Sequence, residues 1–490
     1  MSTLVIGAGV NELACAHALA RAGRRVLVLE ERADDARGAP DRGWVPPQLI
    51  RSFGLSPREL KVERPDPWAA VPLPDGGYLE LWRDMERSVD AIRRVSPRDA
   101  AKWPDFCGRM RTLARLLERV YVAPPPDPLS RDAGDVARLA VLGLQARLIG
   151  RQGLEDLLRL IPMPVADWLD DWFECDALKG VLGAAGVTRL QQGPRSGGTA
   201  FVLLHHHVGS PAGVFRPPRS NLRQVLAELP GVEVRNRAAV ARIRVRSGRA
   251  DGVVLASGEE IAAELVVSGA DARRTLLDLV DPGWLDPQLV RSLAHVRRRG
   301  VVARATLALD RPPAWPRLVE APSLEYLERA YDDAKYGRLS RQPYLEATSV
   351  GTGAGGRHPM EVEVQYAPYR LADGAWDDAR RRALGSLALG ILSRYLPDAG
   401  ATVERVESPR DLEERHGFPE GQEYHAELAL DQALWMRPVP ALARYAAPID
   451  GLYLCGPGMH PGGGVAGAAG INAARVVLRD LRRAPGRGKS

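Results

Sequence analysis

Cysteine is scarce in this chain of 490 residues. Its four cysteines are Cys15, Cys107, Cys175 and Cys455. They lie far apart in apolar surroundings and form no C-x-x-C pair, which excludes a zinc ribbon and a disulfide framework. The spacing is typical of buried thiols in a reducing compartment, and we expect no structural metal.

Long apolar runs are also missing. No uninterrupted apolar stretch approaches the roughly 20 residues of a membrane-spanning helix. The first residues enter a strand without a basic segment followed by an apolar one. We expect a cytoplasmic location. Peripheral membrane contact stays open because residues 105–122 form a basic amphipathic pattern, for which a core-facing helix with a solvated charged side is the alternative.

Lysine is rare as well, so arginine supplies most of the positive charge. The net charge is +6 and the pI is near 9.2. Single arginines alternate with aspartate and glutamate and do not gather into the basic patch that nucleic-acid binding needs. We expect no nucleic-acid partner.

The chain does contain a nucleotide-binding pattern, STLVIGAGVNELACAHALARAGRRVLVLEER, at residues 2–32. An apolar strand, a helix at 11–23 and a second strand predict a βαβ unit. Gly7 allows the tight turn, Gly9 lets the backbone approach a pyrophosphate, and the helix N-terminus attracts the phosphate charge. Glu30 ends the second strand, where an acid can bind an adenosine ribose.

Glu12 stands where this G-x-G-x-x-G pattern has its third glycine. Its carboxylate suits the positive end of the helix dipole, but it also lies beside the position of a pyrophosphate. Because like charges repel, we expect the dinucleotide to bind more weakly than in proteins with the glycine.

Helical and β-rich blocks alternate along the rest of the chain. From about 82 to 190 the apolar residues follow helical spacing. Strands are expected near 200, over FVLLHHHVG, and at 300–310 and 360–370, with a helix at 376–396. This alternation predicts an α/β protein with two domains threaded through each other.

Two further patterns predict no site. GTGAGGRH at 351–358 lies between two expected strands, so no helix N-terminus follows to bind a phosphate, and we interpret it as a hairpin loop. His205, His206 and His207 are adjacent in an expected strand and would point to alternate faces, which disfavours a metal site. Packing, or the wall of a substrate cavity, is the alternative role for these histidines.

The closing segment, PIDGLYLCGPGMHPGGGVAGAAGINAARVVLRDL, has a more specific pattern. A strand leads into a glycine-rich loop and then into a helix beginning near Val465, so a second helix N-terminus is available to a ligand. Together with residues 2–32, this segment resembles the flavin-binding segments of the phytoene desaturase-like FAD oxidoreductases. The resemblance covers most of the chain. It is closest to the branch of the pyridine nucleotide-disulfide oxidoreductase domain-containing protein 2. Two further segments resemble that branch, SGGTAFVLLHHHVG and YAPYRLADGAW.

This resemblance implies a Rossmann-type FAD-binding domain at 1–80, 200–290 and 425–490. An α+β substrate domain at 81–199 and 291–424 is interleaved with it, as in flavin oxidoreductases and amine oxidases. The cofactor-binding residues that the resemblance implies are Gly7, Gly9, Asn11, Glu30, Arg32, Val240, Gly456, Gly463, Gly464, Val465 and Gly467.

Three departures from the family pattern concern the cofactor. Glu12 is the first. A Gly-Gly pair expected after Glu30 is replaced by DDARGAPDRGW, in which only Gly38 is in place, and VFRPPRSNLRQVL lacks the Gly-Gly turn before the helix near 220. We expect that FAD binds weakly or that its site has been lost.

The implied function is that of an FAD-dependent desaturase, dehydrogenase or isomerase that acts on an apolar small molecule, such as a polyene or a long chain. Trp168, Trp172 and Phe173 could form the wall of the substrate cavity, and they are equally suited to a core. His460 is a weak candidate for proton transfer, with a structural hydrogen bond as the alternative.

Two other functions remain open. A flavin-free paralogue would serve as a binding or scaffold protein, with an apolar cavity and with Glu12 and Arg219 filling the flavin space. A flavin amine oxidase shares the N-terminal fold. The sequence does not identify the substrate, the electron acceptor or the oligomeric state.

Overall fold

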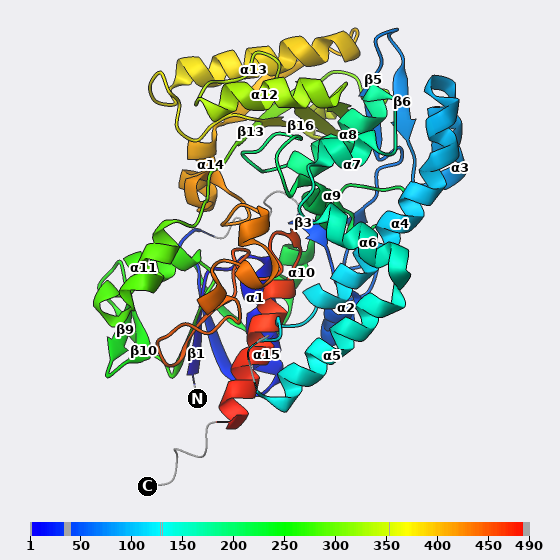
Figure 1. The fold of residues 1–490 in the computed structure, drawn as a ribbon. Coiled ribbons are helices and arrows are strands. Elements are labelled where there is room, and N and C mark those ends of the chain that lie inside the picture. Colours follow the sequence, from blue (N-terminus) through cyan, green and yellow to red (C-terminus); the bar gives the residue numbers. More distant parts are fainter. Residues whose placement is uncertain (1, 34–40, 128, 130, 352, 484–490) are drawn as a thin grey trace.

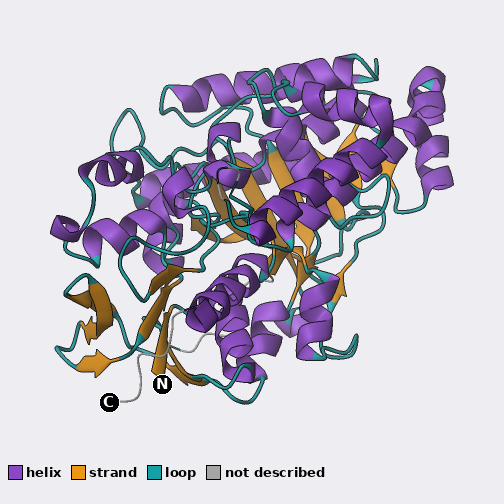
Figure 2. Ribbon diagram, turned by 60° about the horizontal axis from the view of Figure 1, so that its bottom comes forward, coloured by secondary structure: helices purple, strands orange, loops and turns teal. Residues whose placement is uncertain are grey.

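Two large sheets, one parallel and one mostly antiparallel, organise the chain at opposite ends of the molecule (Figure 1). The computed structural model describes residues 2–33, 41–127, 129, 131–351 and 353–483. Helices pack around the strands (Figure 2). Gly38 lies outside the described residues.

The parallel sheet has the strand order β18-β12-β1-β2-β8. Its strands are β1 (Ser2–Ile6), β2 (Arg25–Leu29), β8 (Glu233–Arg235), β12 (Leu265–Ser268) and β18 (Leu452–Leu454). Its central strands are runs of valine, leucine and isoleucine, as expected where both faces are covered. Helices α1 (Val10–Arg21), α10 (Leu222–Glu228) and α15 (Ala468–Arg483) complete this half.

The second sheet has seven strands in the order β17-β13-β16-β15-β14-β5-β6, antiparallel apart from the β14–β5 pair. They are β5 (Ala69–Pro72), β6 (Tyr78–Leu81), β13 (Val302–Leu309), β14 (Arg317–Glu320), β15 (Leu345–Ser349), β16 (His358–Gln365) and β17 (Thr402–Glu407). Strands β15 and β16 pair across the loop at 351–358, which confirms the predicted hairpin.

Two small sheets complete the β-structure. One is antiparallel, with β9 (Val240–Arg246), β10 (Arg249–Leu255) and β11 (Glu260–Ala262). The other has the order β19-β3-β7-β4, with β3 (Asp41–Trp44), β4 (Val62–Glu63), β7 (Arg219–Ser220) and β19 (Gly464–Val465). The second small sheet joins the glycine-rich C-terminal loop to segments from the first half of the chain.

The other helices lie mainly around the seven-stranded sheet and along one flank. Before residue 190 they are α2 (Pro47–Phe53), α3 (Met85–Val95), α4 (Pro97–Tyr121), α5 (Ala133–Leu148), α6 (Gly150–Leu160), α7 (Val165–Asp170) and α8 (Asp176–Val187). After it they are α9 (Thr199–His207), α11 (Pro287–Ala294), α12 (Leu324–Lys335), α13 (Asp378–Leu392) and α14 (Pro409–His416). No helix of the described part of the chain is both long and apolar enough to cross a bilayer.

Within FVLLHHHVG, the residues up to His207 belong to helix α9, and the predicted strand is wrong. Every residue from Thr199 to His207 is buried. A helix that is buried on all sides has no polar stripe, so its sequence lacks the helical period that would have identified it. At the C-terminus, the helix predicted near Val465 begins later, at Ala468, because Gly464 and Val465 form β19.

The aromatic residues of the helical region form a core. Trp168 and Phe173 are buried, and Phe106 packs edge-to-face on Trp172 and Phe173. Trp103 stacks on Phe106 within the same cluster. These contacts assign the aromatic side chains to packing.

The predicted domain bounds stay a prediction. The strands of the parallel sheet come from the segments predicted for the FAD-binding domain. Strand pairing places β5 and β6, at the end of the segment 1–80, in the seven-stranded sheet instead.

Close packing of α1 against α15 requires a glycine. A Cβ on Gly470 would overlap the backbone carbonyl of Asn11. We expect Gly470→Ala to lower the free energy of unfolding by about 1–3 kcal/mol, because backbone must shift to admit a methyl group. Chemical denaturation measures this change.

Gly390→Ala is the matched control, because Gly390 is an exposed helical glycine whose Cβ would meet nothing within 4 Å. It should be neutral or stabilising by up to about 1 kcal/mol. Equal effects of the two substitutions would contradict the close approach of the two helices.

Candidate functional site

The carboxyl ends of three neighbouring parallel strands, β1, β12 and β18, lie together at one place, here called the crevice. Gly9 follows β1, Gly269 follows β12 and Gly456 follows β18. Strand β1 pairs with β2 on one side and with β12 on the other, so these strand ends lie at a topological switch point, where α/β sheets bind ligands. A Cβ on Gly456 would overlap the backbone carbonyl of Gly269. The glycine-rich turns at opposite ends of the chain therefore converge.

Glu12 fills part of this crevice. A Cβ on Gly9 or on Gly269 would overlap the Glu12 side chain, and one on Gly456 would lie 3.4 Å from Glu12 Oε1. The carboxyl accepts a hydrogen bond from its own backbone N–H, at the start of α1. It occupies the position where a helix N-terminus binds an anion.

Burial changes the charge state of Glu12. Desolvation by burial raises the pKa of Glu12 from 4.5 to about 8, and the nearby Glu30 carboxylate adds to this shift. The backbone N–H of Glu12 and the charge of Arg223 act in the opposite direction. The carboxyl is therefore mostly neutral at pH 7. The charge repulsion predicted from the sequence begins only as the pH rises toward 8.

Glu30 lies at the end of β2, beside the first glycine-rich turn. Its Oε2 accepts a hydrogen bond from the Ala8 backbone N–H at 2.8 Å, and Oε1 accepts one from Arg32 N–H at 3.1 Å. The Arg32 side chain is partly exposed and pairs with Glu30 at 3.4 Å. Val240 begins β9 nearby, two residues after Ala238, whose N–H donates to Glu30 O. The structure thus brings these predicted residues together.

The glycines of the C-terminal loop are in contact with protein atoms. A Cβ on Gly463 would overlap the Tyr424 ring, and one on Gly467 would overlap Leu49. Gly464 pairs with Gly43 in the β19–β3 pair, and its Cβ position lies 3.1 Å from His205 Nε2. Close packing therefore explains much of the glycine content of this loop.

Several buried polar atoms beside the two glycine-rich segments have no hydrogen-bond partner among the described residues. They include Asn11 Oδ1 and the Tyr424 hydroxyl. A buried polar group without a partner is costly, so these atoms indicate a polar ligand or water at this place. Tyr424 was not identified from the sequence, and its proximity to Gly463 is created by the fold alone.

The histidines of this region are held by the protein. His460 is fully buried, its Nε2 lies 3.2 Å from Val120 O, and burial lowers its pKa to about 4. His205 bonds Gly463 O at 2.7 Å and the Tyr121 hydroxyl at 2.8 Å. Neutral, hydrogen-bonded rings of this kind favour the structural role for His460. The described residues contain no group of three potential ligands arranged to hold a metal ion.

A buried network of ion pairs, here called the ion cluster, lies between the two large sheets. Its arginines are Arg42, Arg189, Arg216, Arg219, Arg304 and Arg317. Its glutamates are Glu346, Glu361, Glu363 and Glu423. The sequence analysis did not identify the ion cluster, although glutamate alternates with apolar residues in LEATS and HPMEVEVQ, a pattern in which one strand face carries charge.

Strand register places the carboxylates on one face of the seven-stranded sheet. Glu346 pairs with Glu363 across β15 and β16, and Arg304 pairs with Glu363 across β13 and β16. Glu363 accepts ion pairs from Arg189 at 2.7 Å and from Arg42 at 2.8 Å. The arginines hold the pKa of Glu363 below its usual value despite burial. The ion cluster is therefore charged at neutral pH.

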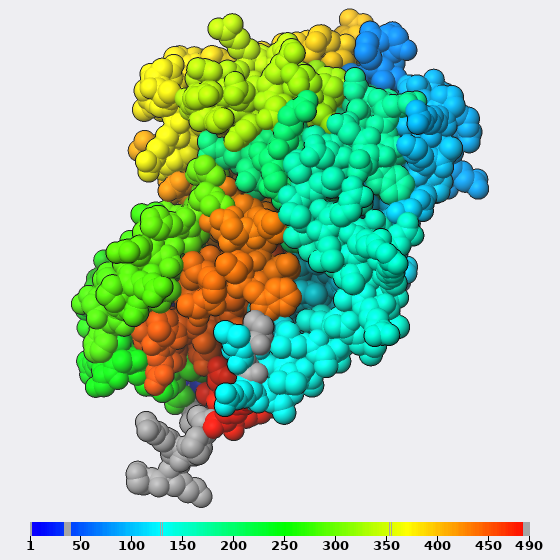
Figure 3. Space-filling view, viewed as in Figure 1, coloured from blue at the N-terminus to red at the C-terminus, as the bar shows by residue number. Residues whose placement is uncertain are grey.

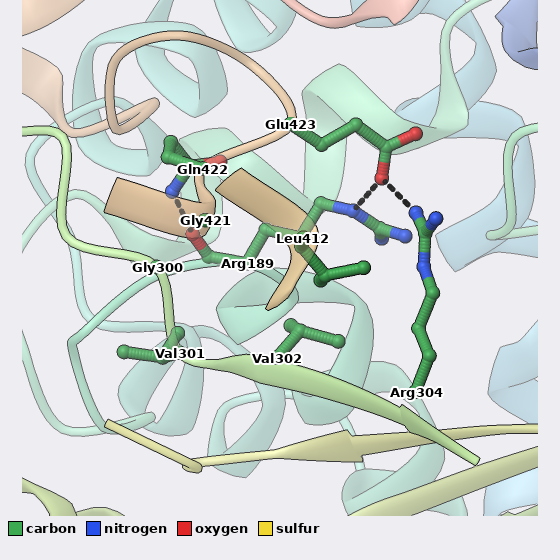
Figure 4. Close-up of a pocket in the computed structure, with 9 residues that line it drawn as sticks. All are labelled: Arg189, Gly300, Val301, Val302, Arg304, Leu412, Gly421, Gln422 and Glu423. Carbon is green, nitrogen blue, oxygen red and sulfur yellow. Dashed lines mark hydrogen bonds and ion pairs between the residues drawn. The ribbon is translucent and has the colours of Figure 1, made fainter. Parts of the chain in front are cut away.

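One edge of the ion cluster borders a small cavity of about 10 Å³ (Figure 4). There the Glu423 carboxylate lies between the guanidinium groups of Arg189 and Arg304, each 2.9 Å away. The cavity has room for about one water molecule.

The crevice, the fold and the loops identify a family. The model of the flavin-containing amine oxidoreductases matches residues 47–478. That match covers most of the chain, so the chain belongs to this family. The family and the fold assign FAD as its cofactor.

Individual relatives agree with this assignment. The pyridine nucleotide-disulfide oxidoreductase domain-containing protein 2 of Rattus norvegicus is 30% identical, over 98% of this chain and 93% of the relative. A neurosporene-forming phytoene desaturase of Cereibacter sphaeroides is 24% identical, over 98% and 95% of the two chains. These matches confirm the resemblance found in the sequence.

A solved structure confirms the predicted two-domain α/β fold. A triple mutant of putrescine oxidase superposes with a TM-score of 0.61 and 15% identity, over 99% of both chains. At this identity the likeness is one of fold.

The residues present fit FAD, with one exception. The open start of α1, Glu30 and the unpartnered Asn11 Oδ1 suit the ADP portion. The Tyr424 hydroxyl, 3.6 Å from the Cβ position of Gly464, offers a hydrogen bond beside the C-terminal loop. Glu12 is the exception, because its carboxyl shares the crevice with the position expected for the pyrophosphate.

We expect Glu12→Gln to remove a pH dependence from both stability and FAD binding. Between pH 4.5 and about 8 the carboxyl is neutral in the folded chain and charged in the unfolded chain. The free energy of unfolding contributed by this group therefore falls as the pH rises through that range. FAD affinity should fall above about pH 8, where Glu12 becomes charged. Denaturation curves and absorbance titrations below and above pH 8 measure both effects.

Glu31→Gln is the control, because Glu31 is half exposed and pairs with Arg274 on the surface. Its substitution should leave both pH profiles unchanged. An FAD affinity that is the same below and above pH 8 in the unsubstituted chain would show that Glu12 turns away when FAD binds.

Proposed function

We propose that the chain is an FAD-dependent oxidoreductase of the dehydrogenase, desaturase or isomerase type. The observation that carries this proposal is the set of unpartnered polar atoms at the two glycine-rich segments, Asn11 Oδ1 and the Tyr424 hydroxyl above all. Family membership supports it, because FAD supplies a ring system that accepts a hydride from a C–H bond.

The chain's own residues would bind and orient the cofactor. Glu30 would accept hydrogen bonds from the adenosine ribose, and the N–H groups at the start of α1 would bind the pyrophosphate. The buried Tyr424 hydroxyl would donate a hydrogen bond beside Gly464. The core around Tyr121 and His205 would exclude water from this side of the loop.

The predicted apolar substrate has little support in the structure. Trp168 and Phe173, proposed as its cavity wall, are packed in a core. The ion cluster borders a cavity with room for about one water molecule, and apolar groups gain nothing from contact with buried charges. A polar substrate is more compatible with this lining.

A flavin amine oxidase remains the enzymatic alternative, because putrescine oxidase shares the fold. Six arginines against four glutamates make the ion cluster net positive. A protonated amine would be repelled there. The charge of the site thus favours a different substrate.

A flavin-free binding or scaffold protein is the second candidate function. The observation that favours it is the Glu12 carboxyl at the start of α1, which already satisfies a helix N–H that a pyrophosphate would otherwise bind. That alternative requires Glu12 and Arg219 to fill the flavin space. Glu12 lies against Gly9 and Gly269, whereas Arg219 pairs with Glu361 in the ion cluster. The expected apolar cavity is replaced by the ion cluster.

An absorbance titration with FAD tests the proposed function. The chain should bind FAD, and Tyr424→Phe should weaken binding without loss of stability, because the substituted hydroxyl has no partner to lose. Candidate hydroxy acids, lipids and amines are then added to the FAD-loaded chain without oxygen. Only one of these classes should reduce the flavin and bleach its absorbance band.

Tyr445→Phe is the matched control, since its hydroxyl donates to His460 O at 2.6 Å. It should lower stability by about 1 kcal/mol. No binding of FAD at any pH would support the flavin-free alternative, and bleaching by amines alone would support the amine oxidase.

We also propose peripheral contact with a membrane, through α5 and α6. These helices lie along one flank of the molecule (Figure 3). Leu144, Leu148 and Leu158 are 56%, 73% and 63% exposed. Large exposed apolar side chains next to Arg138 and Arg147 match the pattern of an interfacial helix on an anionic leaflet. The amphipathic pattern at 105–122, by contrast, belongs to α4, whose apolar side is buried in the core.

Co-sedimentation with vesicles tests this contact. We expect binding to phosphatidylcholine vesicles that contain phosphatidylglycerol, and loss of most binding in the double variant Leu144→Glu, Leu148→Glu. Val350→Glu, which changes an exposed residue outside α5 and α6, should bind as before. If the double variant sediments like the unsubstituted chain, the two helices do not contact the vesicles.

A further inference from the structure

We propose that Arg42, Arg219 and Arg317 bind an anionic group, a carboxylate or a phosphate, of the substrate. This inference rests on the proposed function and names the substrate class of that site.

Strand register places two of these arginines directly opposite each other. Arg42 on β3 pairs with Arg219 on β7. Like charges opposite each other on one sheet repel. Two glutamates partly compensate the charges of this pair. Glu361 lies 2.8 Å from Arg219 and 3.7 Å from Arg42, and Glu363 lies 2.8 Å from Arg42. An anion between the two guanidinium groups would relieve the remaining repulsion.

Two of the three arginines, Arg219 and Arg317, have an unused donor. Arg219 is 3% exposed and Arg317 is 4% exposed, and the Nε of each has no hydrogen-bond partner among the described residues. The one ion pair of Arg317 among those residues joins its Nε to Glu346 Oε1 at 3.5 Å. Thr348 Oγ1, on the residue paired with Arg317 across β14 and β15, is also buried without a partner. A carboxylate or phosphate would accept hydrogen bonds from these donors.

The surrounding acidic groups do not fully compensate the positive charge of the ion cluster. Four glutamates oppose six arginines in the ion cluster, and Asp41 and Arg223 next to it carry one charge of each sign. The phenols of Tyr344 and Tyr424 stay neutral, since burial raises the pKa of both. Burial and neighbouring arginines lower the pKa of Arg219 to about 10, as expected for a cation that lacks a full counter-charge.

The position suits a substrate group. Arg42 immediately precedes Gly43, which pairs with Gly464 of the C-terminal loop. A molecule held by its anionic group at Arg42 would therefore extend toward the loop that the family uses beside its flavin. Binding at an interface between two halves of a fold is typical of small-molecule sites.

Calorimetry on the FAD-free full chain tests the inference. The probes are inorganic phosphate and succinate, compared with chloride at equal ionic strength. We expect one of them to bind with a dissociation constant below about 10 mM. Arg317→Met should weaken binding by about tenfold or more. Its melting temperature without anion should change little, because Glu346 keeps its ion pair with Arg216 at 3.1 Å.

Arg381→Met is the control, since Arg381 forms a two-bond pair with Asp411 away from the ion cluster. It should lower the melting temperature and leave anion binding unchanged. Arg219→Gln, tested beside it, should weaken anion binding as Arg317→Met does, which keeps the test valid if one variant fails to fold.

Preference for phosphate or for succinate distinguishes a phosphorylated from a carboxylated substrate. The inference is overturned if neither probe binds better than chloride, or if Arg317→Met lowers the melting temperature and leaves anion affinity unchanged. FAD binding is measured separately by absorbance, so failure of the proposed function and failure of anion binding give different results.

Discussion

The ion cluster connects the two halves of this molecule. Carboxylates from β15 and β16 face guanidinium groups from β3, β7 and the segment after α8. Breaking one partner of a buried ion pair leaves an uncompensated charge, so each side specifies the position of the other. Because β3 also pairs with β19, this arrangement fixes the C-terminal glycine-rich loop relative to the seven-stranded sheet.

The glycines at the crevice have two physical roles. Some, such as Gly456 and Gly470, let backbone segments approach closely, and others, such as Gly463, leave space for a side chain. A glycine-rich loop is therefore compatible both with a cofactor and with close packing. The buried atoms without partners, on Asn11 and Tyr424, provide the evidence that packing alone does not.

Glu12 shows how one residue alters a dinucleotide-binding site without dismantling it. The strand order, the start of α1 and Glu30 keep the geometry of a dinucleotide crevice. The carboxyl occupies space within it and is largely uncharged at neutral pH because it is buried. Its effect on a pyrophosphate thus depends on occupied space and on pH, and the simple charge argument from the sequence was incomplete.

The sequence by itself determined the βαβ unit, the position of Glu30 after β2, the β15–β16 hairpin and the family, because these depend on local patterns and ordered motifs. Helix α9 was missed, since burial on all sides removes the periodic signal. Only the tertiary structure decided that Tyr424 contacts Gly463 and that ten charged residues form one cluster. These contacts join segments that are separate in the sequence, such as β3 and β16, and no local pattern specifies which segments bring their side chains together.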